Sequence, residues 1–309
     1  MMSEIKLKED QKFSEIEEDQ KKIKSERFNI QYWLTNTLNR RLQDTNFGIS
    51  KETAPIHPAI IDDPLLNQVI KMDIASFLIA EHHSINNTAQ MITLAPDEES
   101  SIFLSTQVLD EARHFEVFNA RIKNLGVTSE KRNELMERYT TPPLKKFFEL
   151  IEEQIDKKSF AGAVVGQNLI LEGMAYPVYR YESKYWSKLD PGLSQIILGA
   201  FADEVQHTGF GEAYLNLIIK KDIIVKNKMK KLIKNFHTLM TEVFDRVIHH
   251  YIGLYQEASN CYMEIQGDIE IFKGHYMKNT SEEEQVRILL DSIQKEYKRR
   301  TIKIGLELD

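Results

Sequence analysis

The sequence Asp-Glu-Ala-Arg-His at residues 110–114 recurs as Asp-Glu-Val-Gln-His at residues 203–207, so both stretches follow the pattern Asp-Glu-x-x-His. On an α-helix, residues three apart lie on one face. Each stretch therefore directs one carboxylate and one imidazole to the same side of a helix. A single pair of this kind is a weak signal for a metal site, whereas two copies in one chain are a strong one.

A glutamate inside an apolar stretch precedes each copy by about one helix-turn-helix. Glu81 ends the stretch Phe-Leu-Ile-Ala-Glu, and Glu172 ends the stretch Leu-Ile-Leu-Glu. One glutamate from each of two helices, with Glu-x-x-His from each of two others, is the inward-facing ligand set of di-iron and di-manganese carboxylate bundles. The sequence thus predicts an all-α four-helix bundle with six metal ligands: Glu81, Glu111, His114, Glu172, Glu204 and His207.

Electrostatics gives the reason for expecting metal ions. Four carboxylates on apolar helix faces would not be tolerated without positive charge, because burying even one unpaired carboxylate is costly. Two divalent cations would neutralise them. Carboxylate and imidazole ligands without a thiolate suit iron or manganese better than a softer metal. Zinc suits the donors by affinity, but it is redox-inert.

The same pattern also predicts a partner for the second ring nitrogen of each ligand histidine. A metal-bound histidine usually donates its other ring N–H to a carboxylate. We therefore expect Asp110 to pair with His207 and Asp203 to pair with His114, each across the site; the alternative is a surface aspartate.

Three further side chains near the expected ligands need an assignment. Tyr176, one turn after Glu172, is a candidate catalytic proton donor, and core packing is its alternative role. His82 and His83 flank Glu81 but point elsewhere on a helix, so we expect neither to be a ligand.

The composition supports one helical domain over residues 1–309. The chain has 42% hydrophobic residues but only 13 glycines and 8 prolines, and long stretches lack turn signals. We expect the core bundle at about 63–220, an N-terminal helix at about 9–42 and C-terminal helices at about 224–304. Helix starts are marked by an N-cap acceptor or acidic residues beside proline at Asp63-Pro64, Pro96-Asp97, Thr141-Pro142 and Asp190-Pro191. Pro177 predicts a kink close to Glu172.

Charge and cysteine content exclude several classes of protein. The net charge of −7 argues against a general nucleic-acid binder, which needs clustered positive charge. The single cysteine, Cys261, excludes an internal disulfide framework and suits a reducing compartment. The charged N-terminal residues resemble no signal peptide, and no uncharged apolar run approaches membrane-spanning length. We expect a cytoplasmic protein that does not bind a membrane.

Residues 63–214 resemble the ferritin-like di-iron carboxylate superfamily, whose ligands fall on the six residues above. The sequences Asp-Glu-Ala-Arg-His-Phe-Glu-Val-Phe and Leu-Glu-Gly-Met-Ala-Tyr are similar to p-aminobenzoate N-oxygenase-like enzymes and to oxidases related to the ribonucleotide reductase small subunit. Several positions depart from these groups. Phe118 replaces the radical tyrosine of the reductase, Ser84 and Gln167 replace the valine and tyrosine that form a crosslink in the ligand-binding oxidases, and Ala200 replaces the third histidine of the N-oxygenases.

The resemblance implies an O2-dependent monooxygenase or oxidase. In such enzymes two iron ions react through a peroxo-diferric intermediate with a small organic substrate, and a reductase or ferredoxin supplies electrons. A homodimer is also implied. The alternatives are a Mn/Fe or di-manganese oxidase of the same fold and a non-catalytic iron-binding or storage protein. Helical spacing places the substrate pocket around Phe77, Gln107, Phe118, Tyr176 and Phe201.

Overall fold

A computed structural model describes residue 33 and residues 45–46, 49–50 and 55–307. The elements that lead into the bundle are β1 (Thr45–Asn46), β2 (Ile49–Ser50) and α3 (Ala59–Asp62). The next elements are α4 (Pro64–Ile92), α5 (Glu98–Asn124), α6 (Ser129–Tyr139), α7 (Pro142–Asp156), α8 (Phe160–Val164), the π-helix η3 (Val165–Glu172), α9 (Gly173–Trp186) and α10 (Pro191–Lys221). The C-terminal part comprises α11 (Ile223–Asn260), α12 (Met263–Gln266), β3 (Glu270–Phe272), β4 (His275–Tyr276), the 3-10 helix η4 (Met277–Asn279) and α13 (Glu282–Lys303).

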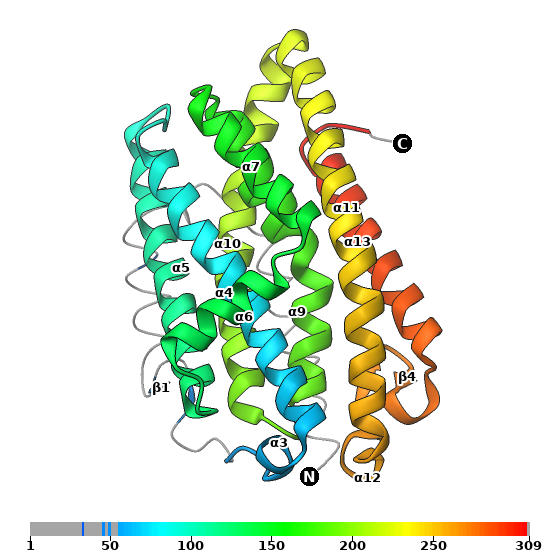
Figure 1. Ribbon diagram of the computed structural model, residues 1–309. Coiled ribbons are helices and arrows are strands. Elements are labelled where there is room, and N and C mark those ends of the chain that lie inside the picture. The colour runs from blue at the N-terminus through cyan, green and yellow to red at the C-terminus, as the bar shows by residue number, and fades with distance from the viewer. Residues whose placement is uncertain (1–32, 34–44, 47–48, 51–54, 308–309) are drawn as a thin grey trace.

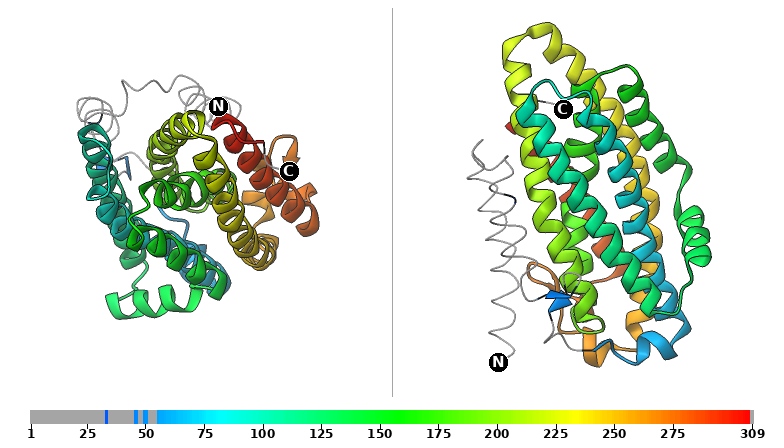
Figure 2. Two further views of the ribbon diagram at one scale, coloured as in Figure 1. Left: turned by 90° about the horizontal axis from the view of Figure 1, so that it is seen from above. Right: turned by 90° about the vertical axis from the view of Figure 1, so that its left-hand side faces the viewer.

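The predicted all-α bundle is confirmed (Figure 1). One half of the bundle is the pair α4 and α5, and the other half is the continuous segment α8, η3 and α9 with α10. Helix α10 also contacts α5, which joins the halves. Helix α11 packs against η3, α13 packs against α9, and the two helices pack against each other. Helix α13 lies at the edge of the bundle when it is seen from above (Figure 2).

The helix-start signals act as expected. The Asp63 side chain accepts hydrogen bonds from the backbone N–H groups of Leu65 and Leu66, and Pro64 occupies the first turn of α4. Asp190 caps α10 in the same way by accepting from Leu193. These caps fix where α4 and α10 begin, and hence the height at which Glu81 and Glu204 lie in the bundle.

The helical segment that carries Glu172 contains a feature that the sequence did not indicate. Residues 165–172 form a π-helix that ends at Glu172, and regular α-helix resumes at Gly173. Across from it, a Cβ on Gly211 of α10 would lie only 2.6 Å from Cβ of Asn168. Glycine at 211 therefore allows α10 to approach the π-helix closely.

Other details also went beyond the prediction. Helix α6, which crosses outside the bundle, and the short antiparallel pair β3–β4 were not expected. The segment before α4 contains β2, which pairs Ile49 with Asn46 of β1, and the short helix α3. Of the predicted helix over about 9–42, only Trp33 is among the described residues, and it is helical. None of the described helices combines the length and apolar character needed to cross a bilayer.

Candidate metal centre

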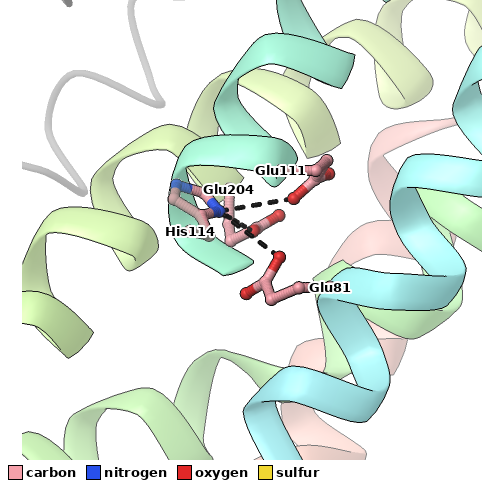
Figure 3. A group of neighbouring side chains, drawn as sticks. All are labelled: Glu81, Glu111, His114 and Glu204. Carbon is pink, nitrogen blue, oxygen red and sulfur yellow. Dashed lines mark ion pairs between the residues drawn. The ribbon is translucent and has the colours of Figure 1, made fainter. Parts of the chain in front are cut away.

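All six predicted ligands converge in the middle of the bundle. Their donor atoms form two overlapping groups, in each of which the atoms lie within 4.8 Å of one another. The first group contains Glu81, Glu111, His114 and Glu204 (Figure 3), and the second contains Glu111, Glu172, Glu204 and His207. Glu111 and Glu204 belong to both, as bridging ligands between two ions would. All six side chains are at most 5% exposed.

The two histidines present the same ring nitrogen to the carboxylates. Nδ1 of His114 lies 3.5 Å from Glu81, 3.3 Å from Glu111 and 3.6 Å from Glu204. Nδ1 of His207 lies 3.4 Å from Glu111 and 3.2 Å from Glu204. Each Nδ1 thus faces a cluster of carboxylate oxygens, and each Nε2 points away from it.

The opposite ring nitrogens face the two aspartates in the crossed arrangement expected from the sequence. Nε2 of His114 lies 3.1 Å from Asp203 Oδ2, and Nε2 of His207 lies 3.5 Å from Asp110 Oδ2. Both aspartates are buried. A carboxylate on Nε2 favours the tautomer that carries its proton there, which leaves the Nδ1 lone pair free to bind a cation.

Buried polar atoms without partners show that this donor set fits metal ions. Within the described residues, Glu81 Oε1, Glu111 Oε2 and His114 Nδ1 are buried and have no hydrogen-bond partner. Buried polar atoms are ordinarily paired. A cation among them would satisfy all three, and oxygen and imidazole donors suit iron and manganese.

The proton affinities of the cluster reflect crowded negative charge. Burial and the charges of Glu111 and Glu204 raise the pKa of Glu81 well above its ordinary value, and burial with Glu204 does the same for Glu172. Burial and Glu111 raise the pKa of Glu204 to about 7. Burial acts in the same direction on Glu111, but His207 and His114 outweigh it and lower its pKa to about 2.

The pKa values of the two histidines shift in opposite directions. Burial lowers the pKa of His114 to about 4, whereas Glu111 and Glu204 overcome burial and raise the pKa of His207 well above its ordinary value. The cluster therefore retains protons in places that divalent cations would take over.

Three amide side chains, none of which the sequence predicted to contact a metal ligand, hold Glu172. Gln107 and Gln167 donate to its Oε1 at 2.8 and 3.0 Å, and Asn168 donates to its Oε2 at 3.3 Å. Asn168 also donates to the side-chain oxygen of Gln107 at 3.0 Å. The π-helix brings Gln167, Asn168 and Glu172 to one side, so the network depends on this local geometry.

Two more residues contact the aspartates. The indole N–H of Trp33 donates to both carboxylate oxygens of Asp110, at 3.1 and 3.0 Å. Arg113 donates to Asp203. Arg113 is therefore not an ordinary surface cation, since it balances the buried charge of an aspartate that faces His114.

Arg300 of α13 contacts the backbone next to Glu172 and a buried glutamate of α10. Its Nε donates to the carbonyl of Gly173 at 2.9 Å, and its Nη1 donates to Glu212 at 2.7 Å. In an α-helix the carbonyl of Gly173 would accept from residue 177, but Pro177 has no N–H. The buried guanidinium thus replaces a missing helix hydrogen bond one residue after Glu172.

Tyr176, His82 and His83 lie outside the two groups of possible metal ligands. Tyr176 is fully buried; its hydroxyl donates to the backbone carbonyl of Glu204 at 3.1 Å and its ring lies 4.1 Å from the Arg300 guanidinium. These contacts match the packing alternative, and its catalytic role stays a prediction. His83 stacks on Phe148, His82 is exposed, and neither belongs to the carboxylate–histidine groups.

An apolar cavity of about 160 Å³ lies beside the centre, in a different place from the predicted pocket. Phe77, from the predicted set, lines it; Gln107, Phe118, Tyr176 and Phe201 do not, and all four are fully buried. The difference arises because α11, which the prediction did not place, forms one wall of the cavity through residues such as Met240, Phe244 and Val247.

Comparison with known proteins places the chain in a family. The model of the long-chain fatty aldehyde decarbonylase family matches residues 72–276, which include all six clustered residues. The chain belongs to this family.

Solved structures of R2-like ligand-binding oxidases share the fold. One with an aerobically reconstituted Mn/Fe cofactor is 18% identical, with a TM-score of 0.61 over 87% of this chain and 91% of that chain. A single-residue variant of such an oxidase with the same kind of cofactor is 18% identical, with a TM-score of 0.63 over 88% and 93% of the two chains. The predicted resemblance to ferritin-like di-metal carboxylate proteins is confirmed. We found no significant match among curated proteins.

Proposed function

We propose that this decarbonylase-family protein is a di-metal oxidoreductase that uses O2 to oxidise an organic substrate. The observation that carries the proposal is the sharing of Glu111 and Glu204 between two buried carboxylate–histidine groups. Two ions bridged in this way and bound by carboxylate and imidazole ligands would supply O2-dependent redox chemistry. The names of the relatives, an aldehyde decarbonylase family and oxidases with Mn/Fe cofactors, agree with such chemistry.

The protein's own residues would position and insulate the ions. Glu81 and His114 would bind one ion and Glu172 and His207 the other, with Glu111 and Glu204 between them. Asp110 and Asp203 hold the imidazoles, and Gln107, Gln167 and Asn168 hold Glu172. The apolar cavity excludes water and orients the substrate. An external electron donor would return the ions to their reduced state.

The metal content remains part of the proposal. We propose two iron ions, and a Mn/Fe pair is the second candidate because the related oxidases are named with that cofactor. Storage of iron is a different function of the same fold. It would need many ions per chain, whereas the structure offers two overlapping ligand groups among the described residues.

O2 consumption tests the proposal. Protein loaded anaerobically with ferrous iron, or with ferrous and manganous ions together, is mixed with O2 while O2 uptake and absorbance are followed. We expect rapid uptake of O2 in proportion to bound metal pairs, and none in a Glu204→Ala variant. Uptake that continues with added iron until many ions are bound per chain would support storage and contradict an oxygenase or oxidase.

A further inference from the structure

The turn between α10 and α11 carries the two most exposed large apolar side chains of the described residues. Ile223 and Ile224, the first residues of α11, are 67% and 75% exposed, and Leu217 near the end of α10 is 54% exposed. This turn projects beyond the neighbouring α4–α5 turn at the same end of the bundle (Figures 1 and 2). We call residues 217–226 the hairpin tip.

The exposed isoleucines do not belong to the face of α11 that packs on the bundle. The buried face of this helix begins with Met229 and Ile233. One turn before Met229 lies Val225, which is half-buried, whereas Ile223 and Ile224 lie off this face. Single exposed apolar residues are ordinary, whereas a contiguous exposed group marks an interaction surface.

Lysines surround the hairpin tip, although the chain as a whole is acidic. Residues 213–241 contain seven lysines and one aspartate, whereas the net charge of the whole chain is −7. The lysines are Lys220, Lys221, Lys226, Lys228, Lys230, Lys231 and Lys234. None of their ammonium groups forms an ion pair with a described residue. The one aspartate, Asp222, caps α11 by accepting from the backbone N–H of Ile224 at 2.6 Å. The tip therefore presents unpaired positive charge around exposed apolar side chains.

This combination of side chains suits the surface of an anionic membrane. At such a surface, apolar side chains enter the boundary between headgroups and acyl chains, and lysines on either side lie near the lipid phosphates. Each lysine close to the surface adds to the attraction. The tip has both parts in one short segment, because Ile223 and Ile224 lie between Lys221 and Lys226 in the sequence.

Charge and shape favour a lipid surface over a protein partner. A second copy of the chain, meeting tip to tip, would bring two lysine clusters together, and like charges repel. An acidic protein would satisfy the lysines, but a stable protein interface buries about 800 Å² on each partner. The exposed apolar group here occupies a single projecting turn, around which a fluid bilayer can close. The acidic residues Glu98 and Glu99 belong to the start of α5, which stands back from the tip (Figure 1).

We propose that the hairpin tip docks this protein on an anionic membrane surface, with Ile223 and Ile224 inserted among the lipids and the flanking lysines at the headgroup phosphates. The sequence predicted no membrane partner because no apolar run is long enough to cross a bilayer. Docking at the surface needs no such run, only an exposed apolar segment with basic neighbours. The proposal does not depend on the metal centre.

Flotation of lipid vesicles with the full chain tests the proposal. Vesicles of phosphatidylcholine alone are compared with vesicles of phosphatidylcholine and phosphatidylglycerol at a ratio of about three to one, which carry the negative charge that lysines recognise. We expect the protein to float with the anionic vesicles and to remain largely unbound with the neutral ones. Binding should weaken as salt is added, because screening shortens the range of the lysine charges.

Lysine variants test the electrostatic part. Lys226→Gln/Lys228→Gln should weaken binding to the anionic vesicles about fivefold for each lysine removed. The matched control is Lys131→Gln/Lys145→Gln, which removes the same charge from exposed positions on α6 and α7, away from the tip, and should leave binding unchanged.

Isoleucine variants test insertion. Ile224→Ser should weaken binding about fivefold or more because less apolar surface leaves water, whereas Ile61→Ser, at a 54% exposed position on α3, should not change it. A polarity-sensitive fluorophore on Ile224→Cys, with the exposed Cys261 replaced by serine, reports insertion directly. Its emission should move to shorter wavelength with anionic vesicles, and the emission of the same label on Ile61→Cys should not move.

Several results would overturn the proposal. They are a lack of binding to anionic vesicles at low salt, binding that the lysine and isoleucine variants leave unchanged, and a label at position 224 that stays in water. Retention on soluble polyglutamate without vesicle binding would identify an acidic protein as the partner instead. A dimer in sedimentation that Ile224→Ser dissociates, again without vesicle binding, would identify a second copy. The metal content of the same samples should not differ between the variants, so the outcome is independent of the proposed function.

Discussion

Replacement of Arg300 by methionine should weaken both the fold and the metal centre. The guanidinium is 1% exposed and satisfies two buried acceptors, the carbonyl of Gly173 and Glu212. Removing one partner of a buried ion pair typically costs about 3–5 kcal/mol, because the remaining charge is left uncompensated. Lys303 also contacts Glu212, so we expect the loss in free energy of unfolding to lie near the lower end, about 3 kcal/mol.

Denaturant unfolding and metal titration of Arg300→Met measure this effect. The matched control is Arg299→Met, whose side chain is 43% exposed and should change the free energy of unfolding by less than about 0.5 kcal/mol. Arg300→Lys keeps a charge for Glu212 but not the forked geometry that also reaches Gly173, so its stability should be intermediate. Metal affinity should fall in Arg300→Met because Gly173 follows Glu172. A loss of less than about 1 kcal/mol with unchanged metal affinity would refute the idea that Arg300 replaces the helix bond missing at Pro177.

Three further predictions concern single side chains. Asp203→Asn should lower metal affinity about 10–100-fold in chelator competition because the carboxylate orients His114, and an unchanged affinity would contradict that role. Gly211→Ala should destabilise the protein by about 1–3 kcal/mol in denaturant unfolding, since the new Cβ meets Asn168, whereas Gly199→Ala, with open space around it, should be neutral or stabilising; equal effects would refute the close approach of α10 to the π-helix. Burial raises the pKa of Asp73 to about 7 despite its bonds from Tyr255 and Trp186, so the folded state holds a proton that the unfolded state releases near pH 4, and stability falls as pH rises from about 4 to 7. Asp73→Asn should flatten this slope in unfolding measured across that range; an unaltered slope would assign the pH dependence to other groups.

The convergence of the six expected ligand residues was predictable because the chemistry of buried carboxylates limits the choices. Few buried arrangements tolerate four carboxylates, and a repeated Asp-Glu-x-x-His with two earlier glutamates leaves one sensible geometry. The crossed pairs Asp110–His207 and Asp203–His114 followed from helical spacing and from the need of a bound imidazole for a second partner.

The supporting residues were not predictable, because they depend on contacts distant in sequence. Arg300 lies 127 residues from Gly173, and no local pattern links them. The π-helix at residues 165–172 has no sequence signature comparable to a cap or a turn, and it packs against α10 and α11, which follow it in the chain. The apolar cavity lies elsewhere than the predicted pocket for the same reason: helical spacing within four helices says nothing about α11, which forms one of its walls.

The number of metal ions bound per chain tests the central claim most directly. Metal-free protein, reconstituted anaerobically with ferrous iron and desalted, should retain two ions per chain, and crystals of it should show two anomalous peaks that share Glu111 and Glu204 as ligands. Retention of one ion or none, or peaks away from these two glutamates, would contradict the account of a buried di-metal centre.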